Sequence, residues 1–134
     1  MGQMPSSLPA KQSLLLILLP MVAMVASLRA YLHGMGVRHV YPGGYLVHHL
    51  FVGVLIVLPA AFVLAFPVRS RRVAILTRVA LGIGGGLILD EVVYLVATKA
   101  TDADYISRVS LQGSVLFVFV AALFLLALYW RHRD

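Results

Sequence analysis

Four long apolar runs follow one another along this chain, and most of the charged residues lie in the short connections between them and in the segments before the first run and after the fourth. A helix needs about 20 consecutive apolar residues to cross the hydrocarbon core of a bilayer. The runs cover about residues 13–33, 45–66, 73–98 and 105–130, so each is long enough. None of them alternates apolar and polar residues as the strands of a membrane β-barrel do. The sequence therefore predicts an all-α, polytopic membrane protein, with residues 1–134 forming one bundle of four transmembrane helices.

The composition agrees with burial in a bilayer rather than in a soluble core. Of the 134 residues, 61% are hydrophobic and 12% are charged, whereas soluble domains are about 45–50% apolar and about 25% charged. The absence of cysteine excludes disulfides, thiolate catalysis and thiolate metal sites. The net charge of +6 comes from residues at the ends of the apolar runs rather than along one exposed face. We therefore expect the lipid bilayer, and no nucleic acid, as a partner.

The basic residues also predict an orientation. They are Lys11 before the first run, Arg69, Arg71 and Arg72 between the second and third runs, and Arg131 and Arg133 after the fourth. Short connections rich in arginine and lysine stay in the cytoplasm. We expect both termini and the middle connection on the cytoplasmic side, in a membrane of the prokaryotic cytoplasmic type.

The third run contains an unusual stretch, GIGGGLILDE, from Gly82 to Glu91. Residues four apart share a helix face, so Gly82, Gly86, Asp90 and Tyr94 form one stripe. Small residues at this spacing let two transmembrane helices approach closely. We expect the stripe to pack against the second run, and glycine-rich faces of this kind also suit a homodimer.

Polar residues of all four runs collect at one level of the predicted bundle, in its outer half. They are Arg29 and His33 in the first run, His48 and His49 in the second, Asp90 and Glu91 in the third, and Tyr105, Arg108 and Gln112 in the fourth. Because the second and third runs are antiparallel, His49 is expected opposite Asp90, while His48, adjacent on the helix, is expected to point elsewhere. Ionisable groups inside a membrane are costly, at roughly 2.5–3.5 kcal/mol each near the centre, and by default mark function.

The residue types of this level suggest a metal site. Neutral imidazole and carboxylate together suit a divalent ion such as zinc, iron or manganese. We expect the ligands to be His48, His49, Asp90 and Glu91, surrounded by residues that orient them or bind a substrate, namely Arg29, His33, Tyr94, Arg108 and Gln112. Two observations oppose this interpretation, because adjacent histidines diverge on a helix and the Glu-x-x-His motif of di-iron bundles is absent.

Several functions stay open at this point. The first is a metal-dependent reaction on a small lipid-soluble substrate, for which no catalytic residue is predicted. The second is a small oligomeric transporter or channel in which Asp90 or Glu91 relays protons or ions. The third is a non-catalytic membrane assembly subunit. A purely structural alternative pairs the two carboxylates with Arg29 and Arg108.

Overall fold

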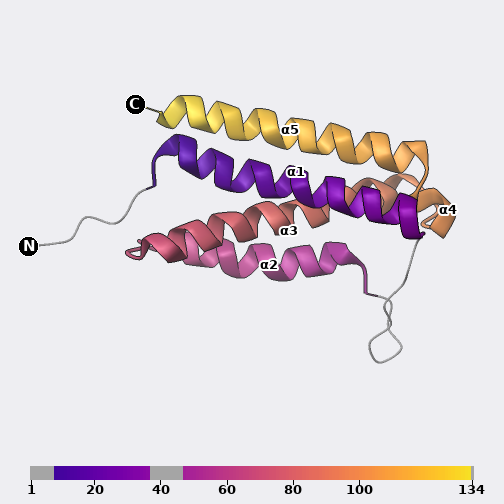
Figure 1. The fold of residues 1–134 in the computed structure, drawn as a ribbon, viewed down its shortest axis with the longest axis horizontal. Coiled ribbons are helices and arrows are strands. Elements are labelled where there is room, and N and C mark those ends of the chain that lie inside the picture. Colours follow the sequence, from indigo (N-terminus) through magenta and orange to yellow (C-terminus); the bar gives the residue numbers. More distant parts are fainter. Residues whose placement is uncertain (1–7, 37–46, 134) are drawn as a thin grey trace, which may run out of the picture.

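The computed structural model describes residues 8–36 and 47–133, and the described part contains helices and no strands. The helices are α1 (Ala10–Met35), α2 (His49–Leu64), α3 (Arg71–Ala97), the short α4 (Asp102–Tyr105) and α5 (Arg108–His132). The long helices lie roughly side by side, and the start of α1 and the end of α5 lie at the same end of the bundle (Figure 1). The predicted all-α architecture is confirmed.

Three of the helices, α1, α3 and α5, are long and apolar enough to cross a membrane. Helix α2 has only 16 residues, which corresponds to about 24 Å at about 1.5 Å per residue. The hydrocarbon core is about 30 Å thick, so α2 is short for a complete span. These helices support an integral membrane protein, and the fourth span stays a prediction.

The ends of α2 have local causes. His48 has an extended backbone, with φ −74° and ψ 140°, so the helix begins only after it. At the other end the sequence Phe66-Pro67 follows, and a residue before proline is driven away from the helical conformation. Residues 45 and 46, which the sequence placed inside this span, lie outside the described residues.

Helix α3 is the central element, in contact with α1, α2 and α5. Its glycines make the close approach possible on two sides. A Cβ added to Gly86 would lie 2.8 Å from the carbonyl oxygen of Met21 in α1, and one added to Gly84 would lie 2.8 Å from that of Gly53 in α2. A Cβ on Gly82 would likewise meet the carbonyl oxygen of Ile17.

The prediction that the Gly82–Gly86 stripe packs against the second run is therefore wrong, because that stripe packs against α1. Gly84 is two residues further along α3 than Gly82, a rotation of about 200° at about 100° per residue. It therefore reaches the opposite neighbour, α2. The sequence identified the face correctly but not which neighbour it meets.

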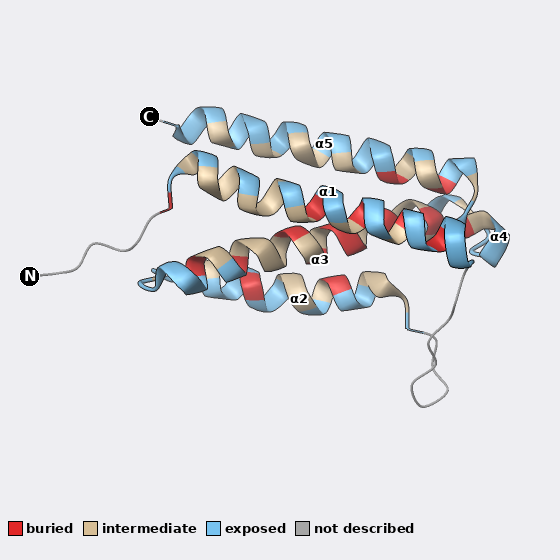
Figure 2. Cartoon of the chain, viewed as in Figure 1, coloured by how far each residue is buried: buried red, intermediate tan, exposed pale blue. Residues whose placement is uncertain are grey.

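The outer surfaces of the bundle are apolar. Large exposed side chains on α2 and α5 include Leu55, Phe62, Leu116, Phe119 and Phe124. Buried residues gather on α3 and on one half of α1, whereas α5 is buried only near its start (Figure 2). A bilayer is the solvent that such a surface requires.

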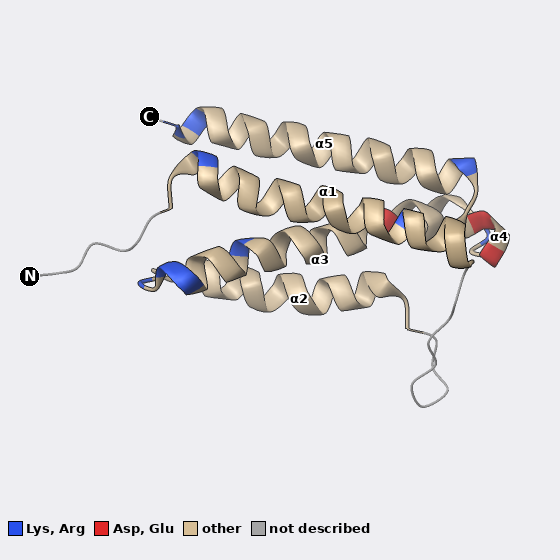
Figure 3. Cartoon of the chain, viewed as in Figure 1, with Lys and Arg blue, Asp and Glu red and all other residues tan. Residues whose placement is uncertain are grey.

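Charge divides the bundle into two ends (Figure 3). We call one the basic end, which carries Lys11, Arg69, Arg71, Arg72, Arg131 and Arg133. The other, here the cluster end, carries every acidic residue of the described chain, namely Asp90, Glu91, Asp102 and Asp104. The connection between α2 and α3 lies at the basic end with the start of α1 and the end of α5 (Figure 1). This arrangement is the one that an N-in/C-in topology requires, although the side of the membrane stays a prediction.

Candidate functional site: a buried polar cluster

The four long helices and α4 meet in a group of hydrogen-bonded polar side chains at the cluster end. This polar cluster consists of Arg29, His48, His49, Asp90, Glu91, Tyr105, Ser110 and Ser114. Asp90 is 0% exposed, Glu91 2% and Arg29 6%, so both carboxylates and the guanidinium are withdrawn from the surface.

Arg29 of α1 connects three other helices. Its Nε lies 2.5 Å from Oδ1 of Asp90 in α3, and its Nη1 donates to the carbonyl oxygen of Tyr105 in α4 at 2.9 Å. Nη2 donates to the carbonyl oxygen of Asp90 at 2.9 Å and to the hydroxyl oxygens of Ser110 and Ser114 in α5 at 3.0 and 2.6 Å. A planar guanidinium with several donors in fixed directions suits this role better than an ammonium group.

The second carboxylate oxygen of Asp90 faces Tyr105 and His49. The Tyr105 hydroxyl donates to Oδ2 at 3.0 Å and lies 2.9 Å from Nε2 of His49. His49 Nε2 itself is 3.4 Å from Oδ2. The antiparallel register predicted His49 opposite Asp90, and the structure places them so.

Glu91 joins α3 to the start of α2. Its Oε1 is 2.5 Å from Nδ1 of His48, and its Oε2 accepts a hydrogen bond from the backbone N–H of Leu50 at 2.7 Å. His48 is the N-cap residue of α2, but its side chain makes no capping hydrogen bond. A carboxylate from the neighbouring helix therefore caps α2, at the position where an anion is favoured by the helix dipole.

The expectation that His48 points away from the cluster is wrong. It assumed that His48 and His49 are both helical, so that their side chains diverge by about 100°. Since His48 precedes the helix with an extended backbone, that rule does not apply. Both histidines therefore lie against the same two carboxylates, with His49 Nδ1 3.4 Å from Oε2 of Glu91.

Tyr94 and His33 lie at the edge of the cluster. Tyr94 is buried, donates to the carbonyl oxygen of Ala100 at 2.7 Å and packs its ring 4.6 Å from that of Tyr105. His33 is exposed, with Nδ1 2.8 Å from the carbonyl oxygen of Arg29 one turn earlier. Tyr94 thus supports the ring of Tyr105, whereas His33 interacts with its own helix.

Arg108 and Gln112 are exposed on α5, and within the described chain no hydrogen bond or ion pair joins them to the cluster. The inward face of α5 carries Ser110 and Ser114 instead, each 0% exposed. Two residues along a helix correspond to a rotation of about 200°, which separates the two faces. The proposed pairing of Arg108 with a carboxylate is therefore absent among the described residues, and Glu91 is paired with His48.

Three members of the cluster were not among the predicted site residues, namely Tyr105, Ser110 and Ser114, although Tyr105 was expected at the same level of the bundle. Ser110 and Ser114 are four residues apart on an otherwise apolar helix. Residues at that spacing lie one above the other on the same face of the helix, so the two serines form a short polar stripe. It was the available indication that this face of α5, rather than the face of Arg108, meets the carboxylates.

The geometry gives the predicted metal site no support. Across residues 8–36 and 47–133, no group of three or more histidine or carboxylate side chains is arranged to hold a metal ion. The physical reason is that the carboxylate oxygens already have partners. Asp90 accepts from Arg29 and Tyr105, and Glu91 accepts from the Leu50 N–H beside His48. No buried side-chain nitrogen or oxygen of the described residues lacks a hydrogen-bond partner.

Helix α4 sets the position of Tyr105 through a capping box. The Thr101 hydroxyl accepts from the Asp104 N–H at 3.2 Å, while Oδ2 of Asp104 accepts from the Thr101 hydroxyl at 2.8 Å and from its N–H at 3.2 Å. These hydrogen bonds, that of the Thr101 side chain first, hold the pKa of Asp104 below its usual value. The cap fixes a four-residue helix that ends at Tyr105.

The chemistry of the cluster is that of charge pairing and hydrogen bonding. It contains two imidazoles, two carboxylates, a phenol and a guanidinium in two hydrogen-bonded groups, which meet where His49 Nδ1 lies 3.4 Å from Oε2 of Glu91. No family model matches the chain, and neither a similar curated protein nor a similar solved structure is found. The polar cluster is therefore the basis for a functional proposal.

Proposed function

We propose that this membrane protein responds to protons, and that the His48–Glu91 pair is its proton-exchange site. One observation carries the proposal: a nearly buried carboxylate is hydrogen-bonded to an imidazole that is partly exposed. The Glu91 side chain is 3% exposed and that of His48 is 21% exposed. Histidine is the side chain whose charge ordinarily changes between about pH 5 and pH 8.

His48 has the contacts expected of a proton acceptor. A carboxylate at Nδ1 favours the tautomer with its proton on that nitrogen, which leaves Nε2 as the basic atom. Among the described residues, no hydrogen-bond partner occupies Nε2 of His48. Imidazoles oriented in this way by a carboxylate serve as general bases in many sites.

Protonation at this pair would act on the fold through α2. The same carboxylate that contacts His48 also accepts the hydrogen bond from the N–H of Leu50. A neutral Glu91 would interact more weakly with the helix N-terminus than an ionised one. A proton taken up at Nε2 of His48 and passed from Nδ1 to Oε1 of Glu91 would therefore loosen the first turn of α2 from α3, which couples proton occupancy to helix position.

Asp90 is better suited to a structural role than to proton exchange. Its carboxylate contacts the Arg29 guanidinium and the Tyr105 hydroxyl, and it is 0% exposed. Of the functions that the sequence left open, the proposal keeps one element of the transporter alternative, a proton on Glu91 rather than Asp90, and makes it a proton-sensing site rather than a relay across the membrane.

The distribution of ionisable side chains favours proton exchange between the cluster and the solution at the cluster end only. Between the cluster and the basic end, the described parts of α1, α2, α3 and α5 contain one ionisable side chain, Arg78. Arg78 donates to the carbonyl oxygen of Ala74 in its own helix. One copy of the protein thus has a proton site at the cluster end, and no row of ionisable side chains connects that site to the basic end in the described helices.

The test follows the backbone amide of Leu50 by hydrogen exchange, with purified protein in nanodiscs across acidic to neutral pH. We expect the protection factor of Leu50 in the wild type to fall several-fold as the pH falls, while amides in the middle of α3 stay protected. In Glu91→Gln the protection of Leu50 should be low at every pH. His48→Asn, which removes the imidazole, should shift the midpoint of the transition.

Asp102→Asn is the matched control, because it removes an exposed acidic charge at the same end of the bundle but outside both the cluster and the capping box. Its Leu50 transition should resemble that of the wild type. A wild-type protection factor for Leu50 that does not change with pH would refute proton exchange at this pair.

A further inference from the structure

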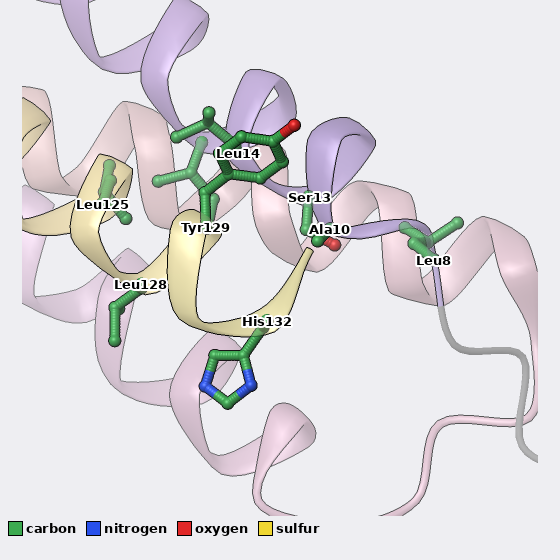
Figure 4. Close-up of a pocket in the computed structure, with 9 residues that line it drawn as sticks. Leu8, Ala10, Ser13, Leu14, Leu125, Leu128, Tyr129 and His132 are labelled. Atoms are coloured by element: carbon green, nitrogen blue, oxygen red, sulfur yellow. The ribbon is translucent and has the colours of Figure 1, made fainter. Parts of the chain in front are cut away.

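We propose that an anionic phospholipid binds in a groove between α1 and α5 at the basic end, with an acyl chain in the groove and the phosphate at its mouth. The groove has a volume of about 420 Å³. Its apolar walls are formed by Leu14 and Ile17 of α1 and by Leu125 and Leu128 of α5. Tyr129 and His132 add polar atoms near its outer end (Figure 4).

The groove lies at the basic end of the bundle, where lysine and arginine residues neighbour its lining residues in the sequence. Lys11 follows Ala10 in the first turn of α1, and Arg131 and Arg133 flank His132 in the last turn of α5. Every acidic residue of the described chain lies at the cluster end. Basic side chains close to a membrane surface attract anionic lipids, and basic pockets between transmembrane helices bind their head groups.

The start of α1 adds to this attraction. Helix α1 begins after Pro9, and no side chain makes a capping hydrogen bond there. The first N–H groups of a helix have no partner within it and carry partial positive charge, which favours a phosphate. The carbonyl groups at the end of α5 are offset by the basic residues of its last turn, Arg131 and His132.

Charge also argues against a second copy of the chain as the occupant. Two copies inserted in the same orientation would place the basic end of one copy beside the basic end of the other, and the like charges would repel. An anionic lipid in that leaflet neutralises the basic end instead. Both walls belong to helices long enough to cross the bilayer, so a lipid chain reaches the groove laterally.

The experiment uses Trp130, which is the only tryptophan of the chain and lies beside the groove residue Tyr129. The protein is reconstituted in phosphatidylcholine vesicles that contain brominated phosphatidylglycerol or, at the same mole fraction, brominated phosphatidylcholine. Bromine quenches tryptophan fluorescence at short range. We expect phosphatidylglycerol to be preferred several-fold in the wild type.

Charge variants test the mouth of the groove. Lys11→Gln and Arg131→Gln should each reduce the preference by up to about fivefold, since one basic residue near a surface contributes about 1 kcal/mol. Arg108→Gln, at the opposite end of the same helix α5, is the matched control and should leave the preference unchanged. Circular dichroism verifies that each variant keeps its helix content.

A size variant tests the groove itself. Ser13 lines the groove, whereas Ser27 is an exposed residue further along α1. Ser13→Phe should abolish the preference by filling the groove, and Ser27→Phe should retain it. A preference that survives Ser13→Phe would mean attraction to the charged end without a groove site, and would overturn the proposal.

The remaining outcomes separate other occupants. Equal quenching by both lipids in the wild type would overturn the proposal directly. Loss of the preference in the presence of inorganic phosphate would assign the site to free phosphate rather than to a lipid. Quenching that depends on the ratio of protein to lipid, and not on lipid charge, would assign the groove to a second copy.

Discussion

At the residue scale, the interactions of Arg29 decide how the cluster holds together. The guanidinium is buried against Asp90 and contacts the hydroxyl groups of Ser110 and Ser114. Charge balance in the sequence indicated Arg29 as a partner of the carboxylates. For the serines the sequence showed only their four-residue spacing, because sequence position gives the depth of a residue in the bundle but not the rotation of its helix.

We predict that Arg29→Met is strongly destabilising, because it leaves the Asp90 carboxylate buried without its cation. Removing one partner of a buried pair costs about 3–5 kcal/mol, whereas replacing both with apolar residues is often close to neutral. The double variant Arg29→Met with Asp90→Leu should therefore recover much of the loss. The measurement is denaturant unfolding in detergent, followed by circular dichroism.

Arg108→Met supplies the control for this series, since Arg108 is exposed at the start of α5. Its stability should change by no more than about 0.5 kcal/mol. A double variant as unstable as Arg29→Met would show that the hydrogen bonds to the tyrosine and serines, and not the ion pair, dominate.

At the element scale, α3 is held by glycines on two faces. Gly84 and Gly53 meet across the contact with α2, while Gly82 and Gly86 meet α1. The glycine spacing in the sequence predicted close helix packing. The sequence did not show which glycines face which neighbour. Helix α3 lies between α1 and α2 and packs against both, so the assignment needed the folded bundle.

We predict opposite effects for two adjacent glycines of α3. A Cβ at Gly84 would lie 2.8 Å from the Gly53 carbonyl oxygen and 2.8 Å from Cγ2 of Val57, so Gly84→Ala should separate α2 from α3 and destabilise the protein. A Cβ at Gly85 would meet nothing within 4 Å. Gly85→Ala should therefore be neutral or stabilising, by up to about 1 kcal/mol from helix propensity.

Thermal unfolding in detergent measures both variants under the same conditions. Because the two positions are adjacent on one helix, a general effect of alanine on α3 would appear in both. Equal destabilisation of Gly84→Ala and Gly85→Ala would contradict the packing of Gly84 against α2.

The capping box of α4 predicts a pH effect. Hydrogen bonds from Thr101 hold the pKa of Asp104 below its usual value of about 3.8. A lowered pKa stabilises the fold above the usual value, and that contribution is lost as the pH falls through the lowered pKa. Thr101→Val removes the hydroxyl, so it should raise the pKa of Asp104 and reduce this acid-dependent loss.

The carboxyl chemical shift of Asp104, titrated by nuclear magnetic resonance, measures the change directly. Thr98→Val is a matched control in the same connection, because the Thr98 hydroxyl bonds to Tyr94 and to the N–H of Ala100. An Asp104 titration that is identical in the wild type and in Thr101→Val would contradict the capping box.

At the scale of the whole molecule, the separation of charge was the most predictable feature. The apolar runs predicted the helices, and the basic residues predicted that the start of α1, the end of α5 and the α2–α3 connection lie at one end of the bundle. The length of α2 was not predictable, because the sequence from Tyr45 to His48 is apolar enough to continue a helix. Its start depends on a tertiary contact with Glu91.

We predict that the basic end faces the cytoplasm, because the connection before α3 contains Arg69, Arg71 and Arg72. A cysteine introduced at Ser70 should react with a membrane-impermeant maleimide only after the cells are opened. A cysteine introduced at Thr101, at the cluster end, should react in intact cells. The reverse labelling pattern would place the cluster on the cytoplasmic side.

The capping of α2 by Glu91 has a consequence for how the chain enters the membrane. Helix α2, at 16 residues, is short for an independent span, and the Leu50 N–H at its start is satisfied by a side chain that is synthesised later. Inserted alone, α2 would present that N–H to lipid without a partner, which is unfavourable in hydrocarbon. We therefore expect the translocation machinery to hold α2 until α3 emerges and to release the two together as a helical hairpin. The order of biogenesis thus depends on a single carboxylate.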